Sequence, residues 1–263
     1  MPTVEPSLTR EEIQRFMSDG FVVLRSAFDP DLAARGRAIL WADMGLNPDR
    51  PAEWREPAIR LIPSDETPFR EAVNTPVLLA AFDQLVGKGR WYRRPNAGAF
   101  VVRFPVDASP DDVGWHVEGS FAVDGTHHTN LVSRERGLLL LMLFSDVDTR
   151  DGPTKIRVGS HLDVPAVLRN AGDVGLRFHE LAPAAAEASA HRDVTFATGR
   201  AGDVYLCHPF IVHSAQAHSG TAPRFMSQPG LTIREPLALE RPDGDYSPVE
   251  QAVRAGLEPT VAA

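Results

Sequence analysis

The chain beyond Trp91 consists of short apolar runs separated by turn sequences, and this pattern limits the possible folds more than any other feature. The turns are rich in Gly, Pro, Asp and Ser, as in DASPDD, TRDGP and SGTAP. Strands of this length and spacing are typical of antiparallel sandwiches and barrels. The runs are GAFVVRF, GWHVEGSF, GLLLLMLF, TKIRVG, DVTFAT, GDVYLCH, FIVHSA and RFMSQPGLTI.

The residues before Trp91 favour helices. Thr9 and Glu12 have the spacing of a capping box, and Gly20 stands where the first helix would end. An extended run, FVVL, follows. Further helices are predicted over residues 29–45, 75–87 and 247–256. Helices followed by many strands predict a mainly β, α+β fold whose N-terminal helices pack outside a β core.

We expect a single domain over residues 1–263, because neither an internal repeat nor a linker composition divides the chain. Its predicted parts are a helical N-terminal part (1–90), a β core (91–235) and a C-terminal tail (236–263). Two segments are long for connections: the loop 47–68 and the insert 171–193, which we expect to be partly helical at best. Long loops on rigid scaffolds often carry specificity, so both are candidate lids.

Composition excludes some partners. The formal net charge of −8 argues against nucleic acid or an anionic membrane as the main partner, although a local cationic pocket remains compatible with it. The single cysteine, Cys207, allows no intrachain disulfide. The opening MPTVEPSLTREE lacks the apolar centre of a secretory signal, and the longest apolar run, residues 137–144, is too short to span a bilayer. We therefore expect a soluble, cytoplasmic protein.

The candidate metal-binding residues lie in the segments GWHVEGSF and LCHPFIVHSAQAH. On a strand, His116 and Glu118 would point to the same face. With His213 they would give two imidazoles and one carboxylate, the facial set of non-haem Fe(II) oxygenases, which leaves three coordination positions open. A 2-oxo acid can chelate two of these positions and O2 can take the third. Arg224, eleven positions after His213 and followed by apolar residues, could receive the far carboxylate of such an acid.

The chain resembles the phytanoyl-CoA dioxygenase family of Fe(II)/2-oxoglutarate-dependent oxygenases over most of its length. The similar segments are LTREEIQRFMSDGFVVLRSAF, GWHVEGS, DGPTKIRVGSHL and AGDVYLCHPFIVHSAQ. The resemblance implies a double-stranded β-helix, a jelly-roll and cupin-like core. It also implies that His116, Glu118 and His213 bind iron and that Arg224 binds 2-oxoglutarate. Fe(II), 2-oxoglutarate and O2 are then the expected cofactor and cosubstrates.

The sequence departs from the family pattern at two positions. Glu118 stands where the family usually has aspartate, and its retention of an acid favours hydroxylation over halogenation. Ala215 stands where many members carry a small hydroxyl that touches 2-oxoglutarate. Ser214 or Ser227 is expected to take that role.

Other residues have two interpretations each. Arg103, Arg157 and Lys155 lie on β-like runs, where each could reach 2-oxoglutarate or an acidic substrate group, or form an exposed ion pair. Trp115 and Phe121 could wall the substrate site or pack in the core.

None of the other histidines is assigned to the metal. His208 lies five positions from His213, so on one strand it would face the other side and pack in the interior. His161 is expected to hold a turn, whereas His127 and His128 could line a pocket or lie in a solvated loop.

These expectations converge on a dioxygenase that hydroxylates a C–H bond of a small molecule and converts 2-oxoglutarate to succinate and CO2. One alternative is a metal-dependent, cupin-like isomerase or hydrolase that does not use 2-oxoglutarate. Another is a catalytically silent jelly-roll binding domain. The sequence selects neither a substrate nor an oligomeric state.

Overall fold

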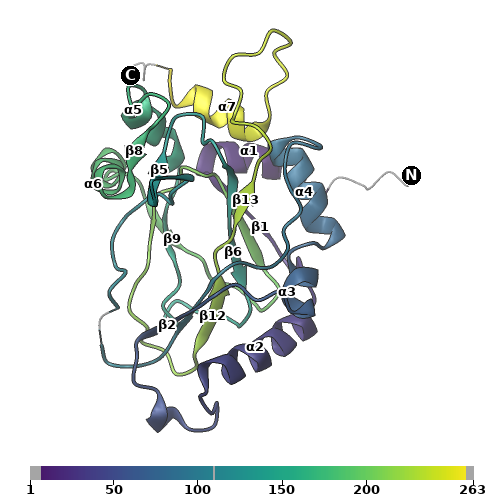
Figure 1. Ribbon diagram of the computed structural model, residues 1–263, viewed down its shortest axis with the longest axis vertical. Coiled ribbons are helices and arrows are strands. Elements are labelled where there is room, and N and C mark those ends of the chain that lie inside the picture. Colours follow the sequence, from purple (N-terminus) through teal and green to yellow (C-terminus); the bar gives the residue numbers. More distant parts are fainter. Residues whose placement is uncertain (1–6, 109, 259–263) are drawn as a thin grey trace.

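Strand β6 (Arg136–Leu143) lies at the centre of the fold because both of its faces are covered. Figure 1 shows the computed structural model, which describes residues 7–108 and 110–258. The even-numbered residues 138–142 pack in a cluster with the helices, and the odd-numbered residues 139–143 pack in a second cluster. Alternation across a strand produces this division. A strand covered on both faces requires a continuous apolar run, which explains GLLLLMLF.

Thirteen strands form three antiparallel sheets. The large sheet has the order β1-β10-β6-β12-β3-β2, with β13 also paired to β6. Two small sheets have the orders β11-β7-β9 and β4-β5-β8. The strands other than β6 are β1 (Phe21–Leu24), β2 (Ala58–Leu61), β3 (Phe100–Arg103), β4 (Phe121–Val123), β5 (Thr126–Thr129), β7 (Lys155–Arg157), β8 (Leu176–Arg177), β9 (Val194–Phe196), β10 (Val204–Cys207), β11 (His213–Ser214), β12 (Arg224–Ser227) and β13 (Gly230–Thr232).

The large sheet faces the β11-β7-β9 sheet across a compact apolar layer. Leu141 of β6, Tyr205 of β10 and Met226 of β12 meet Ile156 of β7 in this layer. Two antiparallel sheets packed face to face, with helices outside, form a jelly-roll architecture without a closed barrel. The predicted fold class is confirmed.

Helices cover the outer side of the large sheet. Figure 1 shows α2, α3 and α4 along the right of the molecule and α5 and α6 at the upper left. The helices are α1 (Arg10–Asp19), α2 (Pro30–Met44), α3 (Thr67–Ala72), α4 (Pro76–Val86), α5 (Val164–Leu168), α6 (Phe178–Ala188) and α7 (Pro248–Ala255), with short 3-10 turns at Pro51–Glu53 and Ser160–Leu162. Within the described residues, no helix combines the length and apolar character needed to cross a membrane.

Side-chain caps mark the start of three of the predicted helices. Thr9 and Glu12 form the capping box of α1, and Gly20 ends that helix with φ of 84°. A side chain at Gly20 would also meet the His161 ring, since an added Cβ would lie 2.5 Å from its Nδ1. Thr75 caps α4 and Ser247 caps α7. Residues 1–6 of the opening segment MPTVEPSLTREE, which is predicted not to be a secretory signal, lie outside the described residues.

Three predictions about elements were wrong in part. The loop predicted over 47–68 contains strand β2 and runs into the unpredicted helix α3. Strand β1 lies at the extended run FVVL, as predicted, and β1 and β2 form the two edges of the large sheet. GWHVEGSF is not a regular strand, because His116 makes only an isolated bridge before β4 begins at Phe121. His127 and His128 belong to β5 rather than to a loop.

Two buried histidines join α1 and α7 to the core. The Nε2–H of His161 donates to the Met17 carbonyl oxygen at 3.0 Å, and that of His208 donates to the Val249 carbonyl oxygen at 3.2 Å. Their ring centroids lie 4.9 Å apart, and both side chains are fully buried. Burial lowers the pKa of His161 to about 4 and holds the pKa of His208 well below its usual range.

We expect the fold to lose stability as the pH falls from about 6.5 to about 5. In the unfolded state the histidines take up protons near pH 6.5, whereas in the folded state they stay neutral. Protonation therefore stabilises the unfolded state and lowers the free energy of unfolding. For His161 alone the loss by pH 5 is about 2 kcal/mol. The prediction is checked by measuring the free energy of unfolding in denaturant across this pH range. His161→Gln should flatten the dependence, whereas His191→Gln, at an exposed position, should not. If stability depended on pH as strongly in His161→Gln as in wild type, His161 would not be the source of the pH dependence.

Candidate metal centre

The centre of the site is a pair of backbone hydrogen bonds between His116 and His213. The His116 N–H donates to the His213 carbonyl oxygen at 2.9 Å, and the His213 N–H donates to the His116 carbonyl oxygen at 3.0 Å. The two residues are therefore direct antiparallel partners, whose side chains point to the same side. Their imidazole centroids lie 4.4 Å apart. Residues 97 positions apart in the sequence are thus fixed side by side.

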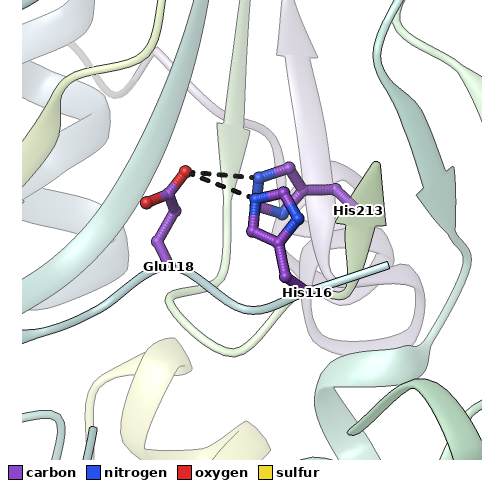
Figure 2. Close-up of side chains that lie close together, drawn as sticks. All are labelled: His116, Glu118 and His213. Carbon is purple, nitrogen blue, oxygen red and sulfur yellow. Dashed lines mark ion pairs between the residues drawn. The ribbon is translucent and has the colours of Figure 1, made fainter. Parts of the chain in front are cut away.

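Both imidazoles turn the same nitrogen toward Glu118. His116 Nδ1 lies 2.9 Å from the Gly114 carbonyl oxygen, and His213 Nδ1 lies 3.2 Å from that of Ile211. A carbonyl can only accept, so each Nδ1 carries the proton in the neutral ring and each Nε2 offers a lone pair. Figure 2 shows both Nε2 atoms directed at one oxygen of Glu118, at 3.7 Å and 3.5 Å.

The segment that carries Glu118 is held by side chains in place of a sheet ladder. Thr129 Oγ1 donates to the Glu118 carbonyl oxygen at 3.2 Å. The Arg136 guanidinium donates to the Gly119 carbonyl oxygen through Nη2 at 2.7 Å and Nε at 3.1 Å. The Ser120 N–H donates to the backbone of β5. These contacts fix the backbone on both sides of the carboxylate.

The electrostatics keep the Glu118 carboxyl group ionised. Burial alone would raise the pKa of Glu118, but the adjacent His116 and His213 outweigh it and hold that pKa well below its usual range. Burial and the neighbouring His116 lower the pKa of His213. Burial also acts to lower the pKa of His116, but contact with Glu118 raises it overall.

These three residues fit a divalent metal ion. His116, Glu118 and His213 each offer one ligand atom, and the three atoms lie within 4.8 Å of one another. The Nε2 atom of the buried His213 has no hydrogen-bond partner. An unpartnered buried nitrogen is costly unless it binds something, and a metal ion is the ligand suited to two imidazoles and a carboxylate. Each ligating ring also has the second hydrogen bond that commonly orients metal-bound histidines.

A cavity of about 260 Å³ opens beside the three ligands. It runs from His116 and His213 to β3 and β12, where Arg103 and Arg224 lie. Its lining residues are Arg60, Val101, Arg103, Asp112, His116, Glu118, Thr154, Phe178, His213, Ala215, Arg224 and Gln228.

Arg224 points into the interior, as its apolar neighbours suggested. It is 2% exposed and donates through Nη1 to the Gly152 carbonyl oxygen at 2.6 Å. Gly152 has φ of 62°, a conformation in which glycine is favoured, and this turn comes from the DGP sequence. The Nε atom of Arg224 has no acceptor among the described residues. Burial, and then the nearby Arg103, lower the pKa of Arg224 to about 9, so it remains charged at neutral pH.

Among the other predicted site residues, only Arg103 lines this cavity. It is 2% exposed, so the alternative of an exposed ion pair is wrong. Lys155 and Arg157 instead lie over the Trp115 ring, at 5.0 Å and 4.4 Å from its centroid. Phe121 packs near His128. Lys155, Arg157, Trp115 and Phe121 do not line this cavity, and their contact with cosubstrate or substrate stays a prediction.

Ser214 and Ser227, the two residues predicted to replace the hydroxyl that Ala215 lacks, lie in different places. Ser227 lies three residues after Arg224 on β12 and therefore faces the opposite side of the strand. Its buried hydroxyl has no partner, and the geometry does not bring it to the cavity. Ser214 Oγ accepts a hydrogen bond from the Gly114 N–H at 3.2 Å, which joins β11 to the segment before His116.

Several cavity residues were not singled out from the sequence. Asp112 and Arg60 form an ion pair at the cavity wall, and Phe178 places its ring centroid 5.5 Å from that of His116. Phe178 begins α6 in the insert 171–193, and Arg60 lies in the segment 47–68. Each predicted lid segment therefore contributes one wall residue; closure by either segment stays a prediction.

Comparisons with known proteins establish the fold. No family model matches the chain, and no curated protein matches it in sequence. HygX from Streptomyces hygroscopicus, solved with nickel and 2-oxoglutarate bound, is 19% identical with a TM-score of 0.55, covering 87% of each chain. EctD from S. alaskensis, solved with bound Fe, is 19% identical with a TM-score of 0.56, covering 92% of this chain and 84% of its own.

A third structure differs in its stated activity. The epimerase SnoN, solved in complex with Fe3+, alpha ketoglutarate and nogalamycin RO, is 18% identical with a TM-score of 0.56, covering 89% of this chain and 86% of its own. Likeness at these identities establishes the shared jelly-roll fold. Membership of the phytanoyl-CoA dioxygenase family stays a prediction.

Removing one imidazole should abolish tight metal binding. We expect His213→Ala to weaken Ni(II) binding at least a hundredfold, because loss of an outer contact alone typically costs tenfold to a hundredfold. Calorimetric titration of the metal-free protein measures it. His191→Ala, at a histidine with a 64% exposed side chain, is the matched control and should bind like wild type. Equal Ni(II) affinity in His213→Ala and His191→Ala would show that His213 does not bind the metal.

Shortening the carboxylate should also weaken the site. In Glu118→Asp the oxygen withdraws by about 1.5 Å, the length of one carbon–carbon bond. The backbone cannot follow it, because Thr129 and Arg136 hold that segment. We expect Ni(II) affinity to fall about tenfold in the same titration, and Glu187→Asp on the exposed face of α6 to have no effect. Tighter binding by Glu118→Asp would show that the segment adjusts freely.

Proposed function

We propose that this protein is an Fe(II)- and 2-oxoglutarate-dependent oxygenase that acts on a small molecule. The observation that carries the proposal is the arrangement of one cavity: three metal-ligand side chains converge at it, and a buried, partly unpaired arginine also lines it. A metal-binding group and a fixed cation in one enclosed space match the two ends of a 2-oxo diacid.

His116, Glu118 and His213 would hold the iron, with one face left for ligands. When bound, the iron supplies the redox chemistry with O2 that side chains cannot provide. The protein's part is to present two neutral imidazoles, whose Nδ1–H groups are fixed by the Gly114 and Ile211 carbonyl oxygens. Those contacts keep each Nε2 free of a proton and directed at the same point.

Arg224 would bind the far carboxylate of 2-oxoglutarate. Its guanidinium is withdrawn from water, and its contact with Gly152 fixes its orientation before any ligand arrives. A charge-assisted hydrogen bond in such an environment is stronger than one at the surface. The chain thereby orients the cosubstrate by one end while the other end reaches the metal.

The cavity wall would exclude water from the reacting atoms. Phe178 lies against His116, and Val101 and Thr154 also line the cavity. A wall of this kind keeps a reactive centre away from bulk solvent. The substrate would enter where the exposed ring of Phe178 and the half-exposed Arg60 meet solvent.

The outcome at the substrate is proposed as oxidation of a C–H bond, most simply hydroxylation, with 2-oxoglutarate converted to succinate and CO2. Structures of this fold include an enzyme described as an epimerase and one described as a carbocyclase, both alpha ketoglutarate dependent. The retained carboxylate at Glu118 supports hydroxylation over halogenation. A small-molecule substrate and a cytoplasmic location remain proposals from the sequence.

The test is succinate formation from 2-oxoglutarate with Fe(II) and O2. We expect slow uncoupled turnover by wild type without a substrate, at least a hundredfold less by His116→Ala, and a KM for 2-oxoglutarate raised at least tenfold in Arg224→Gln. Arg200→Gln, which removes an arginine of a surface ion pair, is the matched control. Metal binding without any 2-oxoglutarate turnover or binding would favour an isomerase or hydrolase instead.

A further inference from the structure

Arg103 and Arg224 stand opposite each other at the end of the cavity. They are register partners on the antiparallel strands β3 and β12, so their side chains leave the sheet on the same face. Each is 2% exposed. Like charges directly opposite one another destabilise a sheet, and burial increases the cost because water no longer screens them. A ligand or side chain of opposite charge is therefore needed at this point.

The described side chains supply only part of that charge. Asp112 Oδ2 accepts from Arg103 Nη2 at 2.6 Å, and Arg224 contacts the carbonyl oxygens of Gly152 and Val101. Asp112 is itself shared, since it lies 3.1 Å from Arg60 Nη2. The cavity is lined by three arginines and two carboxylates, one of which, Glu118, belongs to the metal centre.

Unpaired donors remain at the same place. The Nε and Nη1 atoms of Arg103 and the Nε atom of Arg224 are buried without an acceptor among the described residues. A buried charged donor without a partner costs more than a neutral one, so folded proteins rarely leave several together. Three such donors on two adjacent guanidinium groups are suited to the oxygens of one carboxylate.

We propose that Arg103 and Arg224 together bind a single ligand carboxylate, which, on the function proposed above, is the far carboxylate of 2-oxoglutarate. Arg103 thereby becomes a cosubstrate-binding residue, and its pair with Asp112 keeps the guanidinium turned into the cavity. Selection for a diacid over a monoacid then depends on both arginines rather than on Arg224 alone. The sequence left Arg103 with several interpretations; its burial opposite Arg224 selects this one.

The experiment compares two ligands that differ only at the far end. Ni(II)-loaded protein is titrated calorimetrically with 2-oxoglutarate and with 2-oxopentanoate, which keeps the chelating 2-oxo acid group and lacks the second carboxylate. For Arg103→Gln we expect 2-oxoglutarate affinity to fall tenfold to a hundredfold and 2-oxopentanoate affinity to stay within twofold of wild type. Arg200→Gln, with an equal loss of charge at the surface, should match wild type for both ligands.

Other outcomes separate this inference from the function on which it rests. Wild type that binds Ni(II) but not 2-oxoglutarate would overturn both. Wild type that prefers 2-oxoglutarate, with Arg103→Gln keeping the full preference, would overturn the two-arginine site and leave the oxygenase proposal standing. An equal loss of both ligands in Arg103→Gln would place Arg103 at the metal end and also overturn it.

A second variant covers the case in which Arg103→Gln does not fold, as judged by its melting curve and Ni(II) affinity. Arg103→Lys keeps the charge but replaces the planar donors with a single ammonium group. We expect it to weaken 2-oxoglutarate binding about threefold to tenfold and to leave 2-oxopentanoate unaffected. Wild-type affinity for 2-oxoglutarate in Arg103→Lys would overturn the proposal.

Discussion

The reciprocal backbone hydrogen bonds between His116 and His213 are the contact on which the site depends. They join the irregular segment after Gly114 to the two-residue strand β11, and in doing so they bring two imidazoles to the same side. Neither segment has a long ladder of its own. With the two rings side by side, the Gly114 and Ile211 carbonyl oxygens set the shared direction of the two Nε2 atoms. Thr129 and Arg136 hold the segment that carries Glu118 beside them. A metal centre assembled in this way needs little regular structure at the ligands themselves, because the surrounding sheets supply the rigidity.

The second organising feature is charge that is buried and incompletely paired. Arg224 and Arg103 lie inside a predominantly apolar sheet region, where an arginine is costly unless it binds something. The metal ligands at the other end of the cavity have the same character, since His213 Nε2 is buried without a partner. Both ends of the cavity therefore have buried polar atoms that a ligand could pair. On the proposed function, a metal ion would bind at one end and a diacid carboxylate at the other.

Local sequence patterns predicted the elements whose residues are constrained by their immediate surroundings. The capping box at Thr9, the glycine that ends α1 and the doubly buried β6 each have a strong local signal. Strand β2 lacked one, because AIRL is short, lies in a stretch rich in proline and charge, and becomes a strand only by pairing with β3. The role of Arg103 was equally hard to predict, because an arginine on a strand is usually exposed. Its burial and its pairing with Arg224 are visible only in the structure. Phe178 reaches His116 through the packing of α6, which no spacing in the sequence encodes.

The order of strands in the large sheet also affects how the protein forms. Strand β1 at residues 21–24 pairs with β10 at residues 204–207, so one edge of the sheet joins the beginning of the chain to a segment near its end. Contacts over such separations are slow to form, because a long loop must close before any of them is gained. During synthesis the ribosome must release nearly the whole chain before β1 finds its partner. Until then the apolar side chains of the first helix and strand, Phe16, Val22 and Leu24, lack the partners that bury them in the folded protein.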